Sequence, residues 1–513
     1  MLGLPPDQVL AGLMFAGMIA FLFFGFPVAF SLTFTGLFFG LIGVALGFIQ
    51  LNFFDILPIR IWGTMTNFTL LAVPLFVFMG VALEKSGLAE ELLETMALLF
   101  GALAVLLGYL NANFLDILPL RIWGTMTNFT LLAVPLFVFM GVALEKSGLA
   151  EELLETMGLL FGKLRGGLSI SVVVVGAILA ASTGIVGASV ITMGLISLPT
   201  MLRRGYNKEL ICGTICASGT LGQIIPPSVI LILLGDIMGV PVGDLYIGAV
   251  VPGLILVGLY IIYLFILAQL KPALAPPVPA AELAAFRGEA IKRVTVALIP
   301  AFALIVGVLG SIFMGIASPT EAASVGATGG LFLTIVKRRF SIPMLQSVMQ
   351  TTLRITSLGF IILVGANCFG LVFRGLNGDH LIQEFLKGLP FGSYGVLALV
   401  MLVIFILGFF IDFFEICFIH VPILTPVLVT HFGFDPVWLG VLIAVNLQTS
   451  FLSPPFGFAL FFLRGVVSPN IISTPTIYRG VIPFLALQVI GLTLVIAYPE
   501  VVTGTIVFFR SFW

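Results

Sequence analysis

Uncharged apolar segments of membrane-spanning length recur along most of the chain. The segment 294–316 runs for 23 residues without a charged side chain, and about 20 such residues cross a hydrocarbon core as a helix. Comparable runs lie at 9–30 and 245–268. A chain that crosses lipid must pair its own backbone polar groups, and continuous apolar runs of this length do so as helices. The pattern therefore predicts an all-α polytopic membrane protein.

One uncharged segment, 168–202, has the wrong length for ordinary spans. Its 35 residues would form a helix of about 50 Å, too long for one crossing and too short for two crossings with a loop. Basic residues flank it at 163–165 and 203–208, and basic loops mark the cytoplasmic side. We therefore expect a re-entrant helical hairpin that enters and leaves on the cytoplasmic face, with its turn at 182–189.

The next apolar segment, 210–234, is interrupted at 217–228 by glycines and a Pro-Pro pair. Neither proline nor closely spaced glycines continue a regular helix. The segment is therefore predicted to be a broken helix, which exposes carbonyl and amide groups near the middle of the membrane. The same plan recurs later in the chain: a long apolar stretch, 394–430, is entered from the periplasmic side, and the next span is broken at 446–457 by a second Pro-Pro pair.

The spacing between hairpin and break is the same in both halves. Gly184 and Pro226 are 42 residues apart, and so are Asp412 and Pro454. A hairpin and a Pro-Pro-broken helix, present twice in opposite orientation, form an inverted-topology repeat. Such repeats are typical of secondary transporters, in which the site lies at the midplane where the breaks meet. The fold is therefore predicted to be ion transporter-like.

These features divide the chain into five predicted parts. They are N-terminal scaffold helices (1–167), a first hairpin with its broken helix and return helix (168–268), a cytoplasmic loop (269–293), further scaffold helices with a periplasmic loop (294–392), and a second hairpin with its broken helix and final helix (393–513). The two hairpin-containing parts are expected to form the transport domain.

The N-terminal part contains a near-perfect repeat. Residues 61–96 recur unchanged as 122–157, and weaker similarity extends the tandem unit to 61 residues, 41–101 and 102–162. Solenoid repeats have shorter periods and diverge more, so we interpret this as a recent duplication or a gene-sequence error. An even number of extra membrane segments leaves the sidedness of the following chain unchanged.

Composition supports a membrane protein and excludes several function classes. Charged residues make up 9% of the chain, against about 25% in an ordinary soluble domain. The net charge of −1 gives no basis for nucleic-acid binding. The chain has no P-loop pattern. Its three histidines are scattered and it has no Asp-rich motif, which disfavours a membrane enzyme that activates water. The cysteines are expected to be apolar packing residues rather than metal ligands.

Several motifs together resemble the large membrane subunit, DctM-type, of the tripartite ATP-independent periplasmic (TRAP) transporters. The motifs are Ala180–Leu198, Leu202–Tyr206, Ala217–Ser228, Ser318–Ala323, Gly408–Asp412, Asp435–Trp438 and Asn446–Leu463. The stretches Ser182–Gly187 and Phe418–Pro422 most resemble the mannitol/chloroaromatic branch of that family.

The resemblance implies Na⁺-coupled import by an elevator-like movement of the hairpin domain. It also implies two partners, a small four-helix membrane subunit and a periplasmic substrate-binding protein, and a location in the bacterial inner membrane. Two positions depart from many relatives: Ile185 and Val186 stand in place of two serines, and Gln448 stands in place of Glu. Both changes concern the details of ion coordination. No cofactor is predicted, and Na⁺ is expected only as the coupling ion.

Na⁺ needs several oxygen ligands, which broken helices supply as carbonyl groups and neighbouring hydroxyls complete. The first candidate ion site combines Thr183, Gly184, Ser189, Gly219, Thr220, Gly222 and Pro226, and the second combines Gly408, Asp412, Thr449, Ser450 and Ser453. The candidate groups for an anionic substrate are Gln223, Ser228 and Asn446.

Each of these residues also has a structural interpretation. A serine or threonine hydroxyl can donate back to a carbonyl of its own helix. Asp412 and Glu415 can be satisfied by neighbouring amides, and Glu321, after Ser318, is expected to cap a helix start. His420 suits either a proton relay or a hydrogen-bonded packing role.

The sequence therefore predicts the large permease subunit of a Na⁺-coupled TRAP transporter for a small organic carboxylate, such as a C4-dicarboxylate, a 2-oxo acid or an aromatic acid. The alternative is a stand-alone ion-coupled anion carrier of a related inverted-repeat type. A passive channel fits poorly, because paired hairpins favour alternating access over a continuous pore.

Overall fold

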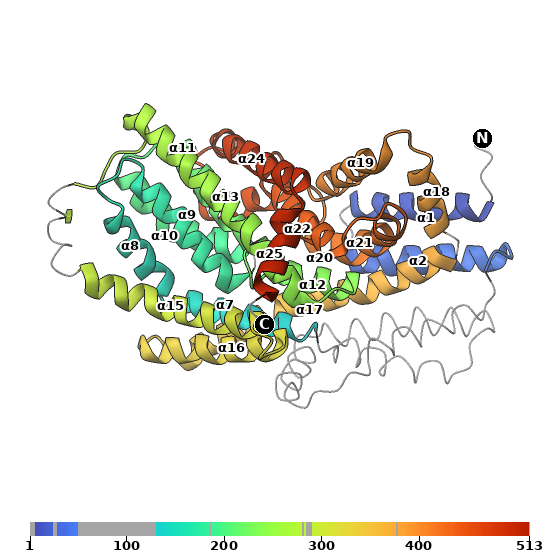
Figure 1. Cartoon of the computed structure of the whole chain (residues 1–513), viewed down its shortest axis with the longest axis horizontal. Helices are drawn as coiled ribbons and strands as arrows, with labels where there is room; N and C mark the ends of the chain where they lie inside the picture. The colour runs from blue at the N-terminus through green and yellow to red at the C-terminus, as the bar shows by residue number, and fades with distance from the viewer. Residues whose placement is uncertain are drawn as a thin grey trace. The chain divides into compact units, whose positions relative to one another are not determined.

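The structure is a computed structural model that describes residues 6–23, 28–49, 130–184, 186–279, 282–283, 290–375 and 378–511. In these ranges every regular element is a helix (Figure 1). Most of the predicted duplication lies outside the described residues, which include 41–49 of the first copy and 130–162 of the second.

The chain forms two compact units. The first contains Met1–Pro135, Leu353–Gly392 and Phe418–Leu424, and the second contains Leu136–Thr352, Ser393–Cys417 and Thr425–Trp513. In the first unit α1 (Pro6–Phe23) packs against α2 (Val28–Ala45) and α18 (Gly378–Lys387). The long helix α17 (Ile342–Gly375) contributes residues to both units. All candidate site residues belong to the second unit.

The second unit contains most of the described helices. Its early members are α7 (Ala133–Lys146, from Leu136 on), α8 (Leu149–Leu160), α9 (Gly167–Thr183), α10 (Val186–Arg203), α11 (Lys208–Thr220), α12 (Val229–Met238) and α13 (Val242–Leu270). Its later members are α15 (Ala290–Phe313), α16 (Pro319–Val336), α19 (Gly392–Leu407), α20 (Phe413–Glu415), α22 (Pro436–Leu452), α23 (Phe458–Val466), α24 (Thr474–Ala497) and α25 (Glu500–Arg510).

Five described helices are long and apolar enough to span a membrane. They are Val186–Arg203, Val242–Leu270, Lys292–Phe313, Phe413–His431 and Thr474–Ala497. A sixth arises if α7 and α8, bent by 60° at their junction, count as one span. The prediction of an all-helical, multi-pass membrane protein is therefore confirmed.

The first hairpin consists of α9 and α10, which pack against each other. Gly184 ends α9 in the left-handed conformation, φ 60°, and its amide donates to the Ala180 carbonyl. A glycine adopts this conformation at no steric cost, which allows a tight turn. At the open end, the amide of Leu168 donates to the Tyr206 hydroxyl at 3.3 Å. The two ends of the segment 168–202 therefore lie together.

The loop that follows α13 closes the same end of the hairpin. Val278 donates its backbone amide to the Gly162 carbonyl at 2.9 Å. The Ala275 and Leu274 carbonyls accept from the amides of Gly166 and Asn207, at 3.0 Å and 2.9 Å. Backbone hydrogen bonds therefore join the predicted cytoplasmic loop to the start of α9 and to the start of α11.

The second hairpin is less regular. After α19 and the short α20, two π-helical turns (Ile416–His420 and Val427–His431) flank α21 (Val421–Pro426). At its open end the rings of Tyr394 and Phe434 meet edge to face, with centroids 5.7 Å apart. This hairpin therefore also has both ends together.

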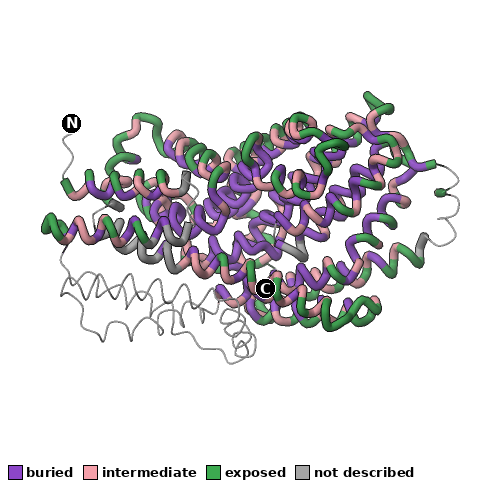
Figure 2. The backbone as a smooth tube through the Cα atoms, turned by 180° about the vertical axis from the view of Figure 1, so that it is seen from behind, coloured by how far each residue is buried: buried purple, intermediate pink, exposed green. Residues whose placement is uncertain are grey.

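Two broken helices follow the hairpins. Leu221–Gln223 forms a single 3₁₀ turn between α11 and α12, and Ser453–Gly457 separates α22 from α23. Both Pro-Pro bonds are cis. Helices α11 and α22 bury every residue except their first two. Buried residues, purple in Figure 2, run through the interior of the packed helices. The sequence pattern predicted both breaks.

The helices of the two halves contact each other in a reciprocal pattern. Helix α11 packs against α23 and α24, and α22 packs against α12 and α13. Helix α10 of the first hairpin contacts α23, and α20 of the second hairpin contacts α12. Helices α11, α12 and α13 thus correspond to α22, α23 and α24. Each of these contacts between the halves has an equivalent contact in which the roles of the two halves are exchanged.

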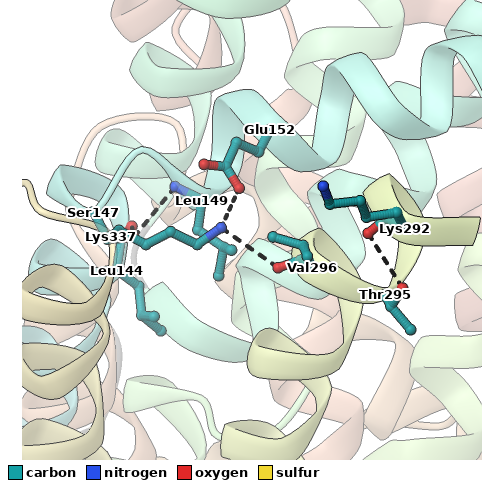
Figure 3. A network of polar contacts seen from close by, with 8 residues as sticks. All are labelled: Leu144, Ser147, Leu149, Glu152, Lys292, Thr295, Val296 and Lys337. Carbon is teal, nitrogen blue, oxygen red and sulfur yellow. Dashed lines mark hydrogen bonds and ion pairs between the residues drawn. The ribbon is translucent and has the colours of Figure 1, made fainter. Parts of the chain in front are cut away.

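Ion pairs hold α8 against the adjoining ends of α15 and α16 (Figure 3). Lys337 pairs with Glu152 and also donates to the Val296 carbonyl at 3.4 Å. Arg293 lies 3.6 Å from a carboxylate oxygen of Glu155. Exposed pairs of this kind contribute little stability, but they align the ends of three helices.

Candidate functional site

The turn of the first hairpin lies beside the first break. A Cβ atom at Gly184 would stand 3.2 Å from the Val229 amide nitrogen and 3.3 Å from the Pro227 carbonyl oxygen. Gly219, near the end of α11, lies still closer to Val190 of α10, where a Cβ atom would overlap a valine methyl carbon. The glycines thus let the hairpin and the broken helix approach backbone to backbone.

Neutral oxygen atoms surround this contact. The Thr220 hydroxyl donates to the Ala217 carbonyl at 2.9 Å, and the Ser228 hydroxyl donates to the Gln223 carbonyl at 2.7 Å. Each hydroxyl uses its proton on its own chain segment, and the Thr220 oxygen also accepts from the side-chain amides of Gln448 and Gln488. Ser189 is buried. Gly222 lies in the 3₁₀ turn and Pro226 follows it, whereas the side chain of Thr183 lies outside the described residues.

The second hairpin meets the second broken helix in a similar way. A Cβ atom at Gly408 would overlap the side chain of Ser450. Ser450 and Thr449 donate to the carbonyls of Leu447 and Val445 at 2.8 Å and 2.9 Å, and Ser453 donates to the Thr449 carbonyl at 2.9 Å. The Asn446 amide donates to the Met401 carbonyl of α19 at 2.7 Å. All three hydroxyls therefore make the back-bonds of the structural interpretation.

The two carboxylates of the second hairpin form a capping box. The Asp412 side chain accepts from the amides at the start of α20, and Glu415 accepts from the Asp412 amide. Asp412 is half-buried and Glu415 is buried. Their oxygens thus replace the backbone acceptors that a helix start lacks. Glu321 makes the same box with Ser318 at the start of α16, as predicted.

Gln223 differs from the other polar side chains at the first break. It is 1% exposed, and among the described residues neither its amide nitrogen nor its amide oxygen has a hydrogen-bond partner. A buried amide without partners costs about 1–3 kcal/mol, so such a group is available to a ligand. It lies in the turn between α11 and α12, next to α9, α10 and α22.

The family model described as the DctM component of the tripartite ATP-independent periplasmic transporters matches residues 15–115 and 102–501. The chain belongs to this family. The second match begins at residue 102, the first residue of the predicted second copy. The protein is therefore a multi-pass transporter permease of the bacterial inner membrane and not an enzyme.

Individual relatives agree with the family match. The C4-dicarboxylate TRAP transporter large permease protein DctM of Pseudomonas aeruginosa is 30% identical over 404 residues, 79% of this chain and 92% of the relative. The sialic acid TRAP transporter large permease protein SiaM of Vibrio cholerae is 27% identical over 405 residues, again 79% and 92%. The isethionate TRAP transporter permease protein DctMQ of Oleidesulfovibrio alaskensis is 26% identical, over 88% of this chain and 66% of the relative.

A solved structure shares the fold. The YdaH transporter of Alcanivorax borkumensis aligns with a TM-score of 0.55 and 16% identity, over 76% of this chain and 90% of that chain. Similarity at this level of identity concerns the arrangement of helices alone.

Sequence reasoning missed two residues near the first break of this TRAP permease. Gln488 of α24 and Tyr260 of α13 are fully buried beside Thr220 and Gln448. The only available signal was a glutamine within the otherwise apolar helix α24. Polar residues inside membrane helices commonly mark functional or packing contacts.

Proposed function

We propose that this chain is the large permease subunit of a Na⁺-coupled TRAP secondary transporter that imports a small organic carboxylate. A periplasmic binding protein delivers the substrate, and a small four-helix membrane subunit completes the complex. The names of the relatives include permeases for a C4-dicarboxylate, sialic acid and isethionate, all organic acids. The proposal includes the mannitol/chloroaromatic-like branch, on the motifs Ser182–Gly187 and Phe418–Pro422.

The observation that carries the proposal is the pairing of each hairpin with its own break. Gly184 packs on the Pro227 and Val229 backbone, and Gly408 packs on Ser450. The reciprocal helix contacts of the two halves support an inverted-topology repeat with re-entrant hairpins. In such transporters the unwound backbone at the breaks coordinates the coupling ion and the substrate.

The ion would be held by neutral oxygens at each break. At the first break these are carbonyl groups near Gly184, Gly219, Thr220, Gly222 and Pro226, with a hydroxyl such as that of Ser189. At the second break they come from Gly408, Thr449, Ser450 and Ser453, with Asp412 contributing charge. Between the breaks, Gln223, Ser228 and Asn446 are the groups proposed for the substrate carboxylate. Alternating access would follow from an elevator-like movement of 168–268 and 393–513.

The test is uptake by proteoliposomes that contain both membrane subunits, with the cognate binding protein added outside. The ligand is first chosen by thermal-shift screening of that protein against succinate, pyruvate and benzoate. We expect a Na⁺ gradient to drive uptake and the Ser453→Ala variant to lose most of it. Ser171→Ala is the matched control, because this buried hydroxyl of α9 makes the same kind of back-bond, to Gly167 at 2.8 Å, away from the breaks.

Uptake that is equally fast without Na⁺ would contradict the proposal. Rapid Na⁺-driven uptake without the binding protein and the small subunit would instead support a stand-alone carrier. Equal uptake by the Ser453→Ala and Ser171→Ala variants would remove the second break from the ion site.

A further inference from the structure

A buried polar cluster joins four helices in the middle of the second unit. It consists of Thr220 at the end of α11, Gln448 of α22, Gln488 of α24 and Tyr260 of α13. All four residues are fully buried. The amide nitrogens of Gln488 and Gln448 donate to the Thr220 hydroxyl oxygen, at 3.3 Å and 3.5 Å. The Tyr260 hydroxyl lies beside both amides without reaching hydrogen-bond geometry with either.

The Thr220 hydroxyl is fully engaged by this arrangement. Its proton goes to the Ala217 carbonyl of α11, and its oxygen accepts from two other helices. A hydroxyl has one donor and two acceptor positions, so no position is left over. The orientation of Thr220, the last residue before the first break, therefore depends on α22 and α24 as well as on its own helix.

The cluster also connects one break with the other. Thr220 is the last residue of α11, and Gln448 lies about one turn before Leu452, where α22 ends at the second break. The hydrogen bond between Gln448 and Thr220 thus links the helix ends that border the two unwound regions. In an interior of low dielectric constant such a bond is stronger than in water, and breaking it leaves unpaired buried groups.

A close crossing of helices α11 and α24 holds Gln488, the third member of the cluster, in place. Gly213 of α11 and Gly480 of α24 approach so closely that a Cβ atom on either would overlap the backbone of the other helix. Thr220 and Gln488 follow these glycines by seven and eight residues, about two turns in each helix. Helix α24 therefore runs parallel to α11 and carries Gln488 to the level of the break.

We propose that Gln448 and Gln488 are positioning residues that couple ion binding at the two breaks. The coupling rests on the proposed function, which places one Na⁺ site at each break. An ion that draws the end of α11 toward its site moves the shared acceptor, Thr220, and with it the helices α22 and α24. Occupation of one site thereby raises the Na⁺ affinity of the other site, and the coupling is reciprocal.

The experiment measures the Na⁺ dependence of uptake by the reconstituted complex, with the ligand found by thermal shift as the probe. The wild type is expected to respond cooperatively, with a Hill coefficient above 1. Gln488→Leu and Gln448→Leu remove the donors but keep apolar volume. Each should bring the Hill coefficient close to 1 and raise the half-saturating Na⁺ concentration at least about five-fold, with the maximal rate preserved.

The matched control is Thr214→Val, which removes another fully buried hydroxyl from α11, one that donates to Leu210 at 2.7 Å outside the cluster. It should leave the Na⁺ curve unchanged. A purely structural role would lower the amount of active protein without altering the shape of the curve. Variants of Gln488 and Gln448 whose curves match that of Thr214→Val would overturn the inference while Na⁺-driven import stands. Import that ignores Na⁺ would overturn both.

A second measurement replaces the uptake assay where a variant yields too little protein for reconstitution. Thermal unfolding of the purified complex is followed with and without Na⁺ for Thr220→Val, Gln488→Leu and the double variant. Coupling predicts that the losses of Na⁺-dependent stabilisation are not additive. Additive losses would contradict it.

Discussion

The two hairpins reach the same arrangement by different means. The first turns on one left-handed glycine between two regular helices, and the hydroxyls of Thr220 and Ser228 at the adjoining break are neutral. The second turns through 408–412, starts a helix with a capping box of two carboxylates, and contains two π-helical turns. What the halves share is a small residue at the tip, packed against a Pro-Pro break. The repeat therefore preserves the meeting of tip and break and leaves the local chain conformation free to differ.

The charges of the second hairpin illustrate the difference. Asp412 and Glu415 accept hydrogen bonds from the backbone of their own segment, whereas at the first tip the Gly184 amide donates to the backbone carbonyl of Ala180. A negative charge is therefore a way of ending an irregular turn as well as a potential ion ligand. Substitutions at the tips, at the open ends and at Asp412 test this comparison of the two hairpins, in decreasing order of expected effect.

The largest effect is expected at the tips. Gly184→Ala places a Cβ atom in a left-handed conformation, which costs about 1–2 kcal/mol, and against backbone atoms of Pro227 and Val229 that no side-chain change can remove. Gly408→Ala instead meets a side chain, that of Ser450. Both variants should lose uptake at normal membrane expression, and only Gly408→Ala should regain part of it when Ser450→Gly is added. Rescue of Gly184→Ala by a side-chain substitution on α12 would contradict this account.

An intermediate effect is expected at the open ends. Tyr206→Phe leaves the buried amide of Leu168 unpaired, at a cost of about 1–3 kcal/mol. Tyr394→Phe keeps the ring contact with Phe434 and alters only an exposed hydroxyl. Thermal unfolding should therefore occur at a lower temperature in the first variant and be unchanged in the second. Equal unfolding temperatures would mean that the Tyr206 bond is dispensable.

The same tyrosine gives a pH dependence. Burial raises the pKa of Tyr206 to about 12, from about 10 in an unfolded chain. Because the folded pKa is the higher one, this contribution to stability is present below about pH 10 and is lost as the pH rises toward 12. Wild type and Tyr206→Phe should thus converge in unfolding temperature over this range. A constant difference up to pH 12 would contradict the assignment.

The smallest effect on folding is expected at Asp412. Asparagine caps helices about as well as aspartate, whereas alanine costs about 1 kcal/mol. Asp412→Asn should therefore unfold like the wild type, and Asp412→Ala at a lower temperature. If the charge also serves the ion, Asp412→Asn will need more Na⁺ for half-maximal uptake. An unchanged Na⁺ requirement in Asp412→Asn would leave the carboxylate with its capping role alone.

Sequence patterns predicted the features that depend on length, charge and backbone chemistry. The basic ends of 168–202 predicted that Leu168 and Tyr206 would lie near each other, and the proline pairs predicted both breaks. The position of Glu321 at a helix start predicted a cap. Asp412 and Glu415 are three positions apart, as are Ser318 and Glu321, but a charge inside an apolar segment also indicates an ion ligand, so the sequence left both roles open for Asp412.

Other features could not be predicted because they depend on packing between distant segments. Gln488 lies 268 residues from Thr220 in sequence, and no local pattern pairs them. The backbone bonds of 274–278 to Gly162, Gly166 and Asn207 involve groups that every residue carries, so side-chain identity does not reveal them.

The crossing of Gly213 and Gly480 also has a consequence for how the chain is made. These residues are 267 positions apart, so at about 5–20 residues per second α24 leaves the ribosome ~13–50 s after α11. During that interval the glycine face of α11 has no native neighbour. Insertion into the bilayer can proceed helix by helix, but the first half reaches its final packing only when synthesis is nearly finished. A chain that stops before residue 474 therefore exposes this face to lipid and to quality-control proteases.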